Sequence, residues 1–73
     1  MLFYEVKYFV NANRLQQTIG VKSAAKLTIT KFKKFMKVYV SKKEEQLITV
    51  EQIKPISEEE IERRFGNNYI VIG

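Results

Sequence analysis

The chain has 73 residues, of which 45% are hydrophobic and 29% charged, and its net charge is +5. This balance is typical of a globular protein of one domain, which we place at residues 1–73. The sequence contains no histidine, cysteine, aspartate or tryptophan. It therefore excludes serine–histidine catalysis, thiol nucleophiles and nearly every common zinc or iron site, and we expect no enzyme activity and no cofactor.

Charge is distributed unevenly along the sequence. Ten basic residues and no acidic residue lie between positions 6 and 43, whereas seven of the eight glutamates lie between positions 44 and 73. Soluble surfaces normally mix both signs, so a long stretch without acids is informative. The pattern predicts one basic and one acidic region, unless folding interleaves them.

The first part of the chain alternates between apolar and polar residues, which is typical of strands. Residues 2–10 show this period of two, with aromatic and valine side chains on one face. A turn signal of two asparagines follows, and residues 14–22 alternate again as the second arm of a hairpin. Gly20 is a candidate for a β-bulge in this arm. The alternative is that residues 11–22 are mostly loop.

An amphipathic helix is predicted over residues 24–36, with Ser23 as its N-cap. At 100° per residue, one side of this helix is apolar and the other carries lysines. The apolar side consists of Ala25, Ile29, Phe32 and Met36, with Phe35 beside them. The β-branched run Thr28–Thr30 disfavours a helix. A strand would place Lys31 and Lys33 on the apolar side, so the helix is preferred.

The next segments read as strand, loop and strand. Residues 38–40 predict a strand, residues 41–45 a loop, and residues 46–53 an antiparallel partner. Ile53 is out of phase with the apolar residues before it. A bulge near Glu51–Gln52 restores the register.

The strongest local signals belong to a second helix, which begins after Ser57 and ends at Gly66. Ser57 and Glu60 form a capping box, and the residues on either side of it, Ile56 and Ile61, form a hydrophobic staple. Acidic residues occupy the first turn and basic residues the last, as the helix dipole favours. Two pairs, Glu59–Arg63 and Glu60–Arg64, have the favourable i,i+4 order, and Ile61 and Phe65 face the core.

Residues 69–72 are apolar on both faces, which is typical of a strand inside a sheet. The predicted order is therefore β-β-α-β-β-α-β. Without the first hairpin it becomes β-α-β-β-α-β, the order of the ferredoxin-like fold. Both orders give a small α+β domain with a mostly antiparallel sheet and two helices packed on one face.

Two functional hypotheses follow from the charge pattern. The first is binding to nucleic-acid phosphates, DNA or RNA, with low sequence selectivity, because lysine is a compact point charge that reads bases poorly. Its candidate residues are Lys26, Lys33, Lys34, Lys37, Lys22, Lys42 and Lys43. Phe3 and Phe9 are candidates for stacking on bases. The ordinary alternative is that these lysines only keep a surface helix soluble.

The second hypothesis is a protein-interaction module, a small regulator or inhibitor of the kind that phages and mobile elements encode. It would bind an acidic protein surface, offer a sheet edge to a partner, or form a homodimer. The sequence shows no signal peptide and no stretch long enough to span a membrane, so we expect a cytoplasmic protein.

Overall fold

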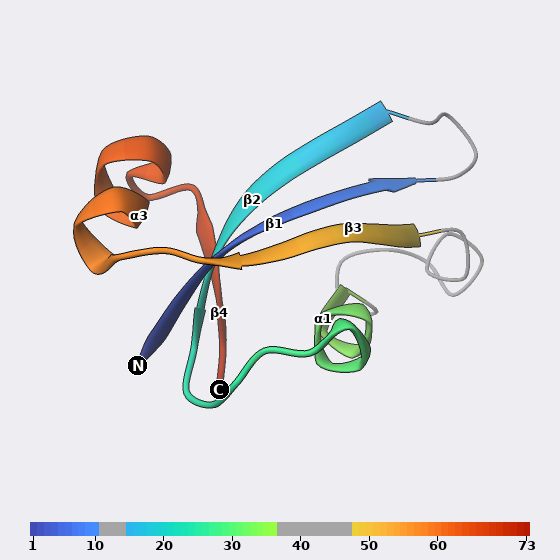
Figure 1. Ribbon diagram of the computed structural model, residues 1–73, viewed down its shortest axis with the longest axis horizontal. Coiled ribbons are helices and arrows are strands. Elements are labelled where there is room, and N and C mark those ends of the chain that lie inside the picture. The colour runs from blue at the N-terminus through green and yellow to red at the C-terminus, as the bar shows by residue number, and fades with distance from the viewer. Residues whose placement is uncertain (11–14, 37–47) are drawn as a thin grey trace.

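The computed structural model describes residues 1–10, 15–36 and 48–73 (Figure 1). These residues form four strands and two helices, in the predicted α+β class. The elements in chain order are β1 (Leu2–Val10), β2 (Leu15–Ser23), α1 (Ile29–Met36), β3 (Ile48–Pro55), α3 (Glu58–Phe65) and β4 (Tyr69–Ile72). Their order matches the prediction, and the strand expected at residues 38–40 lies outside the described residues.

The strands form one mostly antiparallel sheet in the order β3-β1-β2-β4. The first hairpin is confirmed, because β1 and β2 pair antiparallel without interruption from Leu2 opposite Ser23 to Val10 opposite Leu15. β3 pairs antiparallel with the other side of β1, and β4 pairs parallel with β2. β1 is therefore central, and β3 and β4 are the two edges.

One of the two predicted bulges is present. Lys7 of β1 is opposite Gln52, but the next residue, Tyr8, is opposite Val50, so Glu51 is the extra residue of a bulge in β3. The bulge proposed at Gly20 is wrong, because Gly20 pairs with Glu5 in an unbroken register. Gly20 has a different role: a methyl group there would lie 2.9 Å from the ring of Phe65, so the missing side chain lets α3 approach the sheet.

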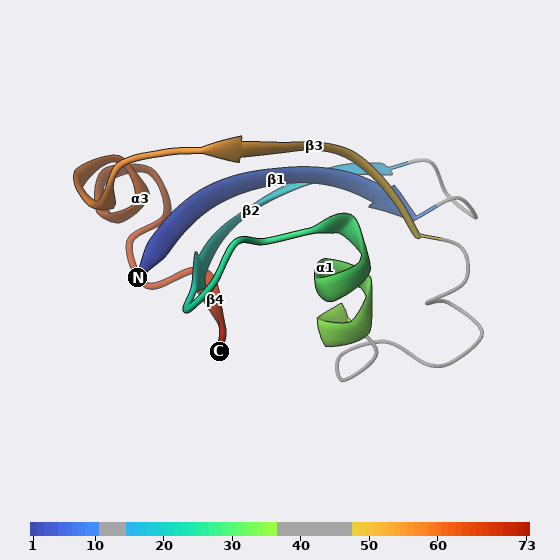
Figure 2. The same cartoon turned by 60° about the horizontal axis from the view of Figure 1, so that its bottom comes forward.

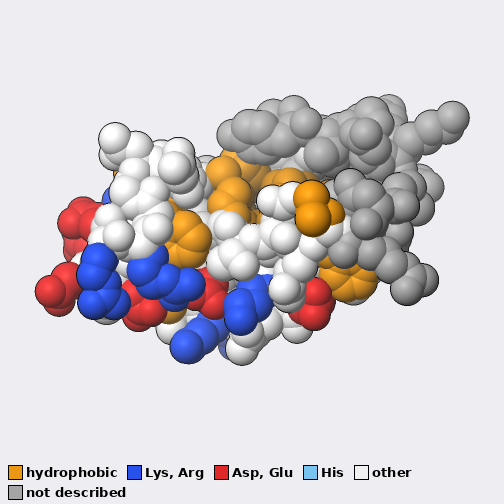
Figure 3. Space-filling view, turned by 90° about the horizontal axis from the view of Figure 1, so that it is seen from above, with side chains coloured by type: hydrophobic (Ala, Val, Ile, Leu, Met, Phe, Trp, Pro, Cys, Tyr) orange, Lys and Arg blue, Asp and Glu red, His pale blue; other side chains and the backbone are white. Residues whose placement is uncertain are grey.

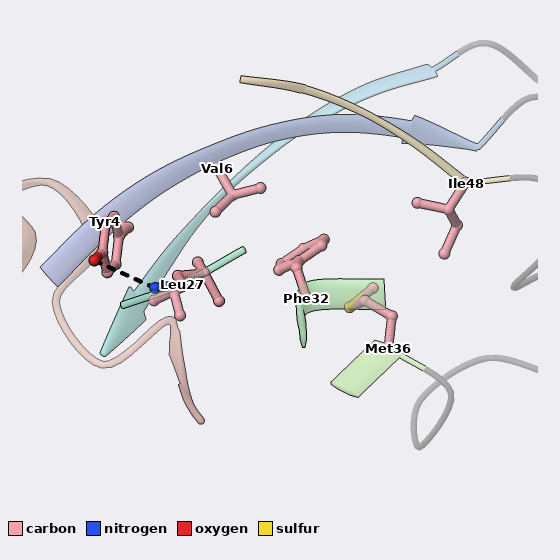
Figure 4. Close-up of a cluster of buried hydrophobic side chains, with 7 residues drawn as sticks. Tyr4, Val6, Leu27, Phe32, Met36 and Ile48 are labelled. Atoms are coloured by element: carbon pink, nitrogen blue, oxygen red, sulfur yellow. Dashed lines mark hydrogen bonds between the residues drawn. The ribbon is translucent and has the colours of Figure 1, made fainter. Parts of the chain in front are cut away.

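The two faces of the sheet differ in chemistry. The core face carries Tyr4, Val6 and Val21, which pack with Leu27 from the segment before α1 and with Phe32 of α1. Figure 4 shows the side chains of Phe32 and Met36 between the helix and the sheet, and the hydrogen bond that the amide of Leu27 donates to the Tyr4 hydroxyl over 3.3 Å. The opposite side, here called the outer face, carries Glu5, Gly20 and Lys22 in the alternating positions.

The helices lie on opposite faces of the sheet, and not on one face as the sequence analysis expected. α1 lies beneath the concave core face (Figure 2), whereas Ile61 and Phe65 of α3 contact the outer face at Gly20. The reason is topological. β2, β3 and β4 run parallel, and the β2–α1–β3 and β3–α3–β4 crossovers move in opposite directions along the sheet. Right-handed crossovers in opposite directions require helices on opposite faces.

α1 begins at Ile29, five residues later than predicted, and Ser23 does not cap it. Ser23 ends β2 and donates its hydroxyl hydrogen to the carbonyl of Ala25. The hydroxyl of Thr28 accepts a hydrogen bond from the amide of Lys31 over 3.1 Å and therefore acts as the cap. Ile29, expected on the buried side, is 51% exposed.

α3 matches its prediction closely. The hydroxyl of Ser57 accepts a hydrogen bond from the amide of Glu60 over 3.0 Å, as the capping box requires. Gly66 ends the helix with φ 56° and ψ −114°, the conformation of the first central residue in a type II′ turn. The amide of Asn68 then donates to the carbonyl of Phe65 over 2.7 Å and closes that turn.

β4 lies at an edge of the sheet, although its sequence predicted an interior strand. Ile70 and Ile72 are half-buried and pack against the core, whereas Val71 is 51% exposed. Apolar residues on both faces of β4 therefore do not mean that both faces are buried. β4 is instead an apolar strand at the edge of the sheet.

Candidate nucleic-acid interface

The lysines of α1 spread over the side of the helix that faces away from the core. Phe32 is fully buried against the sheet. With about 3.6 residues per turn, Lys34 points opposite to Phe32, and Lys31 and Lys33 lie on its two flanks. Lys31 and Lys34 are exposed, whereas Lys33 is half-buried. Three ammonium groups therefore extend from one short helix.

Lys26 joins this group although it is not part of α1. It is exposed in the segment between β2 and α1, and its carbonyl oxygen accepts a hydrogen bond over 3.4 Å from the ammonium group of Lys31. We refer to Lys26, Lys31, Lys33 and Lys34 as the lysine face.

The structure brings together three of the seven predicted residues, Lys26, Lys33 and Lys34. Lys37, Lys42 and Lys43 lie outside the described residues. Lys26 was expected within the helix over residues 24–36, but it lies outside α1, which begins at Ile29. Lys31 was missed, although its i,i+3 spacing from Lys34 would have placed both on the same side of a helix.

Lys22 does not join the lysine face. It projects from β2 on the outer face, where its ammonium group lies 4.2 Å from the ring centroid of Tyr69 and 5.9 Å from that of Phe3. These are cation–π distances, so Lys22 is held between two aromatic rings. Phe3 and Phe9, the candidates for base stacking, are half-buried on this same outer face, away from α1.

Acidic side chains in the described part of the chain all belong to the outer-face side. Glu5 projects from β1 on that face, and Glu51 accepts a hydrogen bond over 3.2 Å from Gln16 across it. The other four, Glu58, Glu59, Glu60 and Glu62, belong to α3. Figure 3 shows acidic and basic side chains close together at the α3 end of the molecule. Among the described residues, no acidic side chain interrupts the lysine face.

Two basic residues on the outer-face side, Arg64 and Lys7, are in contrast paired. Arg64 forms ion pairs with the buried carboxylate of Glu5 and, over 3.0 Å, with Glu60. The hydrogen bonds with Glu60 and Glu5 raise the pKa of the Arg64 guanidinium. Lys7 also approaches Glu5, at 4.0 Å. Glu5, Lys7, Glu60 and Arg64 therefore form one cluster of ion pairs on the outer-face side.

Residues 1–10, 15–36 and 48–73 contain no group of three or more acidic, histidine or cysteine side chains that could hold a metal ion. Neither α1 nor α3 is long and apolar enough to cross a membrane. No protein-family model matches the chain, and comparison with curated proteins and with solved structures found no match.

Proposed function

We propose that this domain binds nucleic-acid phosphates through the lysine face and carries out no catalysis. The observation that supports this most strongly is the separation of charge by the sheet. Every described glutamate lies on the outer-face side, and the four lysines on the other side have no acidic neighbour within residues 1–10, 15–36 and 48–73. A surface of one sign attracts a polyanion over a longer distance than a mixed surface does.

The chemistry of the lysine face favours backbone contacts over base reading. Its charged groups are all ammonium groups, which act as point charges on flexible stems. Reading bases in the major groove relies mainly on bidentate arginine, asparagine or glutamine side chains. We therefore propose binding of low sequence selectivity, with most of the affinity coming from the release of counterions.

The lysines of α1 lie on a helix that the core holds in place. Lys33 and Lys34 lie in the last turn, where the helix dipole favours positive charge. Burial of Phe32 and Met36 fixes the opposite side of the helix to the sheet. The backbone of α1 is thus fixed to the sheet, whereas each lysine side chain can still rotate.

The test is fluorescence anisotropy with labelled DNA and RNA oligonucleotides at several salt concentrations. Each neutralised phosphate contributes about 0.9 to the slope of log affinity against log salt on duplex DNA, so four lysines predict a slope of roughly −4. The double variant K31Q/K34Q should reduce the magnitude of this slope by about 2 and weaken binding to all sequences alike.

The matched control is the double variant K54Q/R63Q, which has the same net charge but changes β3 and α3. It should leave the slope unchanged. Equal losses in both variants would assign binding to net charge alone, and absence of binding at low salt would contradict the proposal. Equally tight binding to polyglutamate would assign the surface to acidic proteins instead.

A second candidate function, pairing with a protein strand, is favoured by a separate observation. β4 is an apolar strand at the sheet edge with half of Val71 exposed. This edge contains none of the lysine-face residues, although Lys31 borders the same hollow as Ile72 and Gly73.

A further inference from the structure

The two edges of the sheet differ in how they resist pairing with another strand. β3 carries the bulge at Glu51, the charged residue Lys54 and a proline, Pro55, which has no amide hydrogen to donate. Bulges, lysines and prolines are devices by which proteins prevent edge-to-edge association. β4, Tyr-Ile-Val-Ile, has none of them. Of the two edge strands that the structure describes, β3 is therefore protected against edge pairing and β4 is not.

The outward side of β4 can be assigned from a hydrogen bond. The amide of Ala24 donates to the carbonyl of Ile72 over 3.0 Å, so the backbone groups of Ile72 point toward β2. The N–H and C=O of one residue point to the same side of a strand, and this side alternates along it. Val71 and Tyr69 therefore direct their backbone groups away from the sheet. No strand in the described residues pairs with them.

We propose that the outer edge of β4 pairs with β4 of a second copy of this chain. The two strands run antiparallel about a twofold axis that passes beside Val71. The backbone groups of Val71 and its counterpart then exchange both hydrogen bonds. Ile70 of each copy then lies opposite Ile72 of the other copy.

Side-chain chemistry makes this pairing self-complementary. Directly opposite residues point to the same face, so each Ile70–Ile72 pair continues the core face across the interface. The two Val71 side chains, each 51% exposed in one copy, contact each other on the outer face. β4 has no charged residue, so no like charges lie directly opposite each other across the two paired strands.

The size of the domain also favours a second copy. A chain this short buries a small core, and association with another copy is one way to enlarge it. The interface is a short strand and therefore small, so we expect a dimer of micromolar affinity.

The twofold axis is perpendicular to the sheet, which leaves both copies with the core face on the same side. The two lysine faces then belong to one surface. If the lysine face binds nucleic acid as proposed above, the dimer should bind a long oligonucleotide more tightly than the monomer. The second lysine face would then contact an oligonucleotide that is already bound to the first.

The dimer itself is tested without nucleic acid, by sedimentation velocity of the whole chain over a range of concentrations. The wild-type protein should pass from monomer to dimer in the micromolar range. V71K should remain monomeric, because it places two like charges at the axis. The matched control is I29K, since Ile29 on α1 is also 51% exposed, and it should dimerise normally. A monomeric wild-type protein, or equal effects of V71K and I29K, would overturn the proposal.

A second measurement needs no variant and remains valid if V71K fails to fold. Amide hydrogen exchange of the wild-type protein is followed by NMR at a low and a high protein concentration. The outward amide of Val71 should exchange rapidly when dilute and become protected when concentrated. The inward amide of Ile70 should be protected at both concentrations. Exchange at Val71 that is independent of concentration would rule out pairing through β4.

Discussion

The two helices have eight residues each but use their charges differently. In α3 the signs follow the helix dipole, and Arg64 is paired with Glu60 and with Glu5 of the sheet. In α1 the first turn has no acid, and its lysines have no acidic partner in the described part of the chain. α3 thus uses charge for its own stability, whereas α1 depends on buried apolar side chains. Within the described residues, no acidic side chain neutralises the lysines of α1.

The largest expected loss of stability comes from truncating Phe32, the side chain that fixes α1 to the sheet. Phe32 is fully buried and packs against Tyr8 in a tilted arrangement, with the ring centroids 5.4 Å apart. F32A should lower the free energy of unfolding by about 3–5 kcal/mol. Urea unfolding followed by circular dichroism measures this. The control I29A, at an exposed position of the same helix, should change stability by less than about 0.5 kcal/mol.

α3 should be sensitive instead to its close approach to the sheet. A methyl group at Gly20 would lie 2.9 Å from the ring of Phe65, so G20A should cost about 1–3 kcal/mol of stability. A smaller side chain, in the double variant G20A/F65L, should recover part of this loss. G73A is the control, because a methyl group there lies 3.8 Å from its nearest neighbour. A neutral G20A would show that α3 is not held at this contact.

The contribution of charge to stability can be compared by removing one charge from the outer face and one from α1. E5Q removes a carboxylate that is buried and paired with Arg64, so it should cost about 1–3 kcal/mol. K34Q removes an exposed charge opposite the core and should change stability by less than about 0.5 kcal/mol. Thermal or urea unfolding at constant salt measures both. Similar losses would show that the charges of α1 also stabilise the fold.

The smallest effects are expected at the caps. S57A removes the acceptor for the amide of Glu60, and T28A removes the acceptor for the amide of Lys31. Each should cost about 1 kcal/mol. S57T and T28S retain a hydroxyl and should preserve most of the stability, as measured by urea unfolding. A neutral T28A would indicate that α1 depends on its buried side chains alone.

Features set by residues close together in the sequence were predicted correctly, whereas features set by tertiary contacts were not. α3 was predicted well because its cap, charge order and stop at Gly66 all lie within a few residues. The bulge at Glu51 was visible because it shifts the phase of apolar residues within one strand. The start of α1 was wrong because tertiary contacts decided it: Ser23 belongs to a paired strand, and Leu27 is buried under Tyr4.

Long-range arrangement was harder to predict. The helices lie on opposite faces because of the strand order, which no local pattern reveals. The same order places Lys22 on the outer face and Lys26 on the other side of the sheet. The sequence thus predicted that the candidate site consists of lysines. Which lysines lie together depended on strand register and on crossover direction.

The central position of β1 has a consequence for folding kinetics. Tyr4 is paired with Pro55, and Val21 with Ile70, and each pair is separated by about fifty residues of chain. An isolated hairpin such as β1–β2 is only marginally stable in water, so the sheet gains stability only when β3 and β4 have joined it. Domains with such distant pairings fold more slowly than helical bundles of equal length. We therefore expect this chain to fold late, in one cooperative step, after most of it has been synthesised.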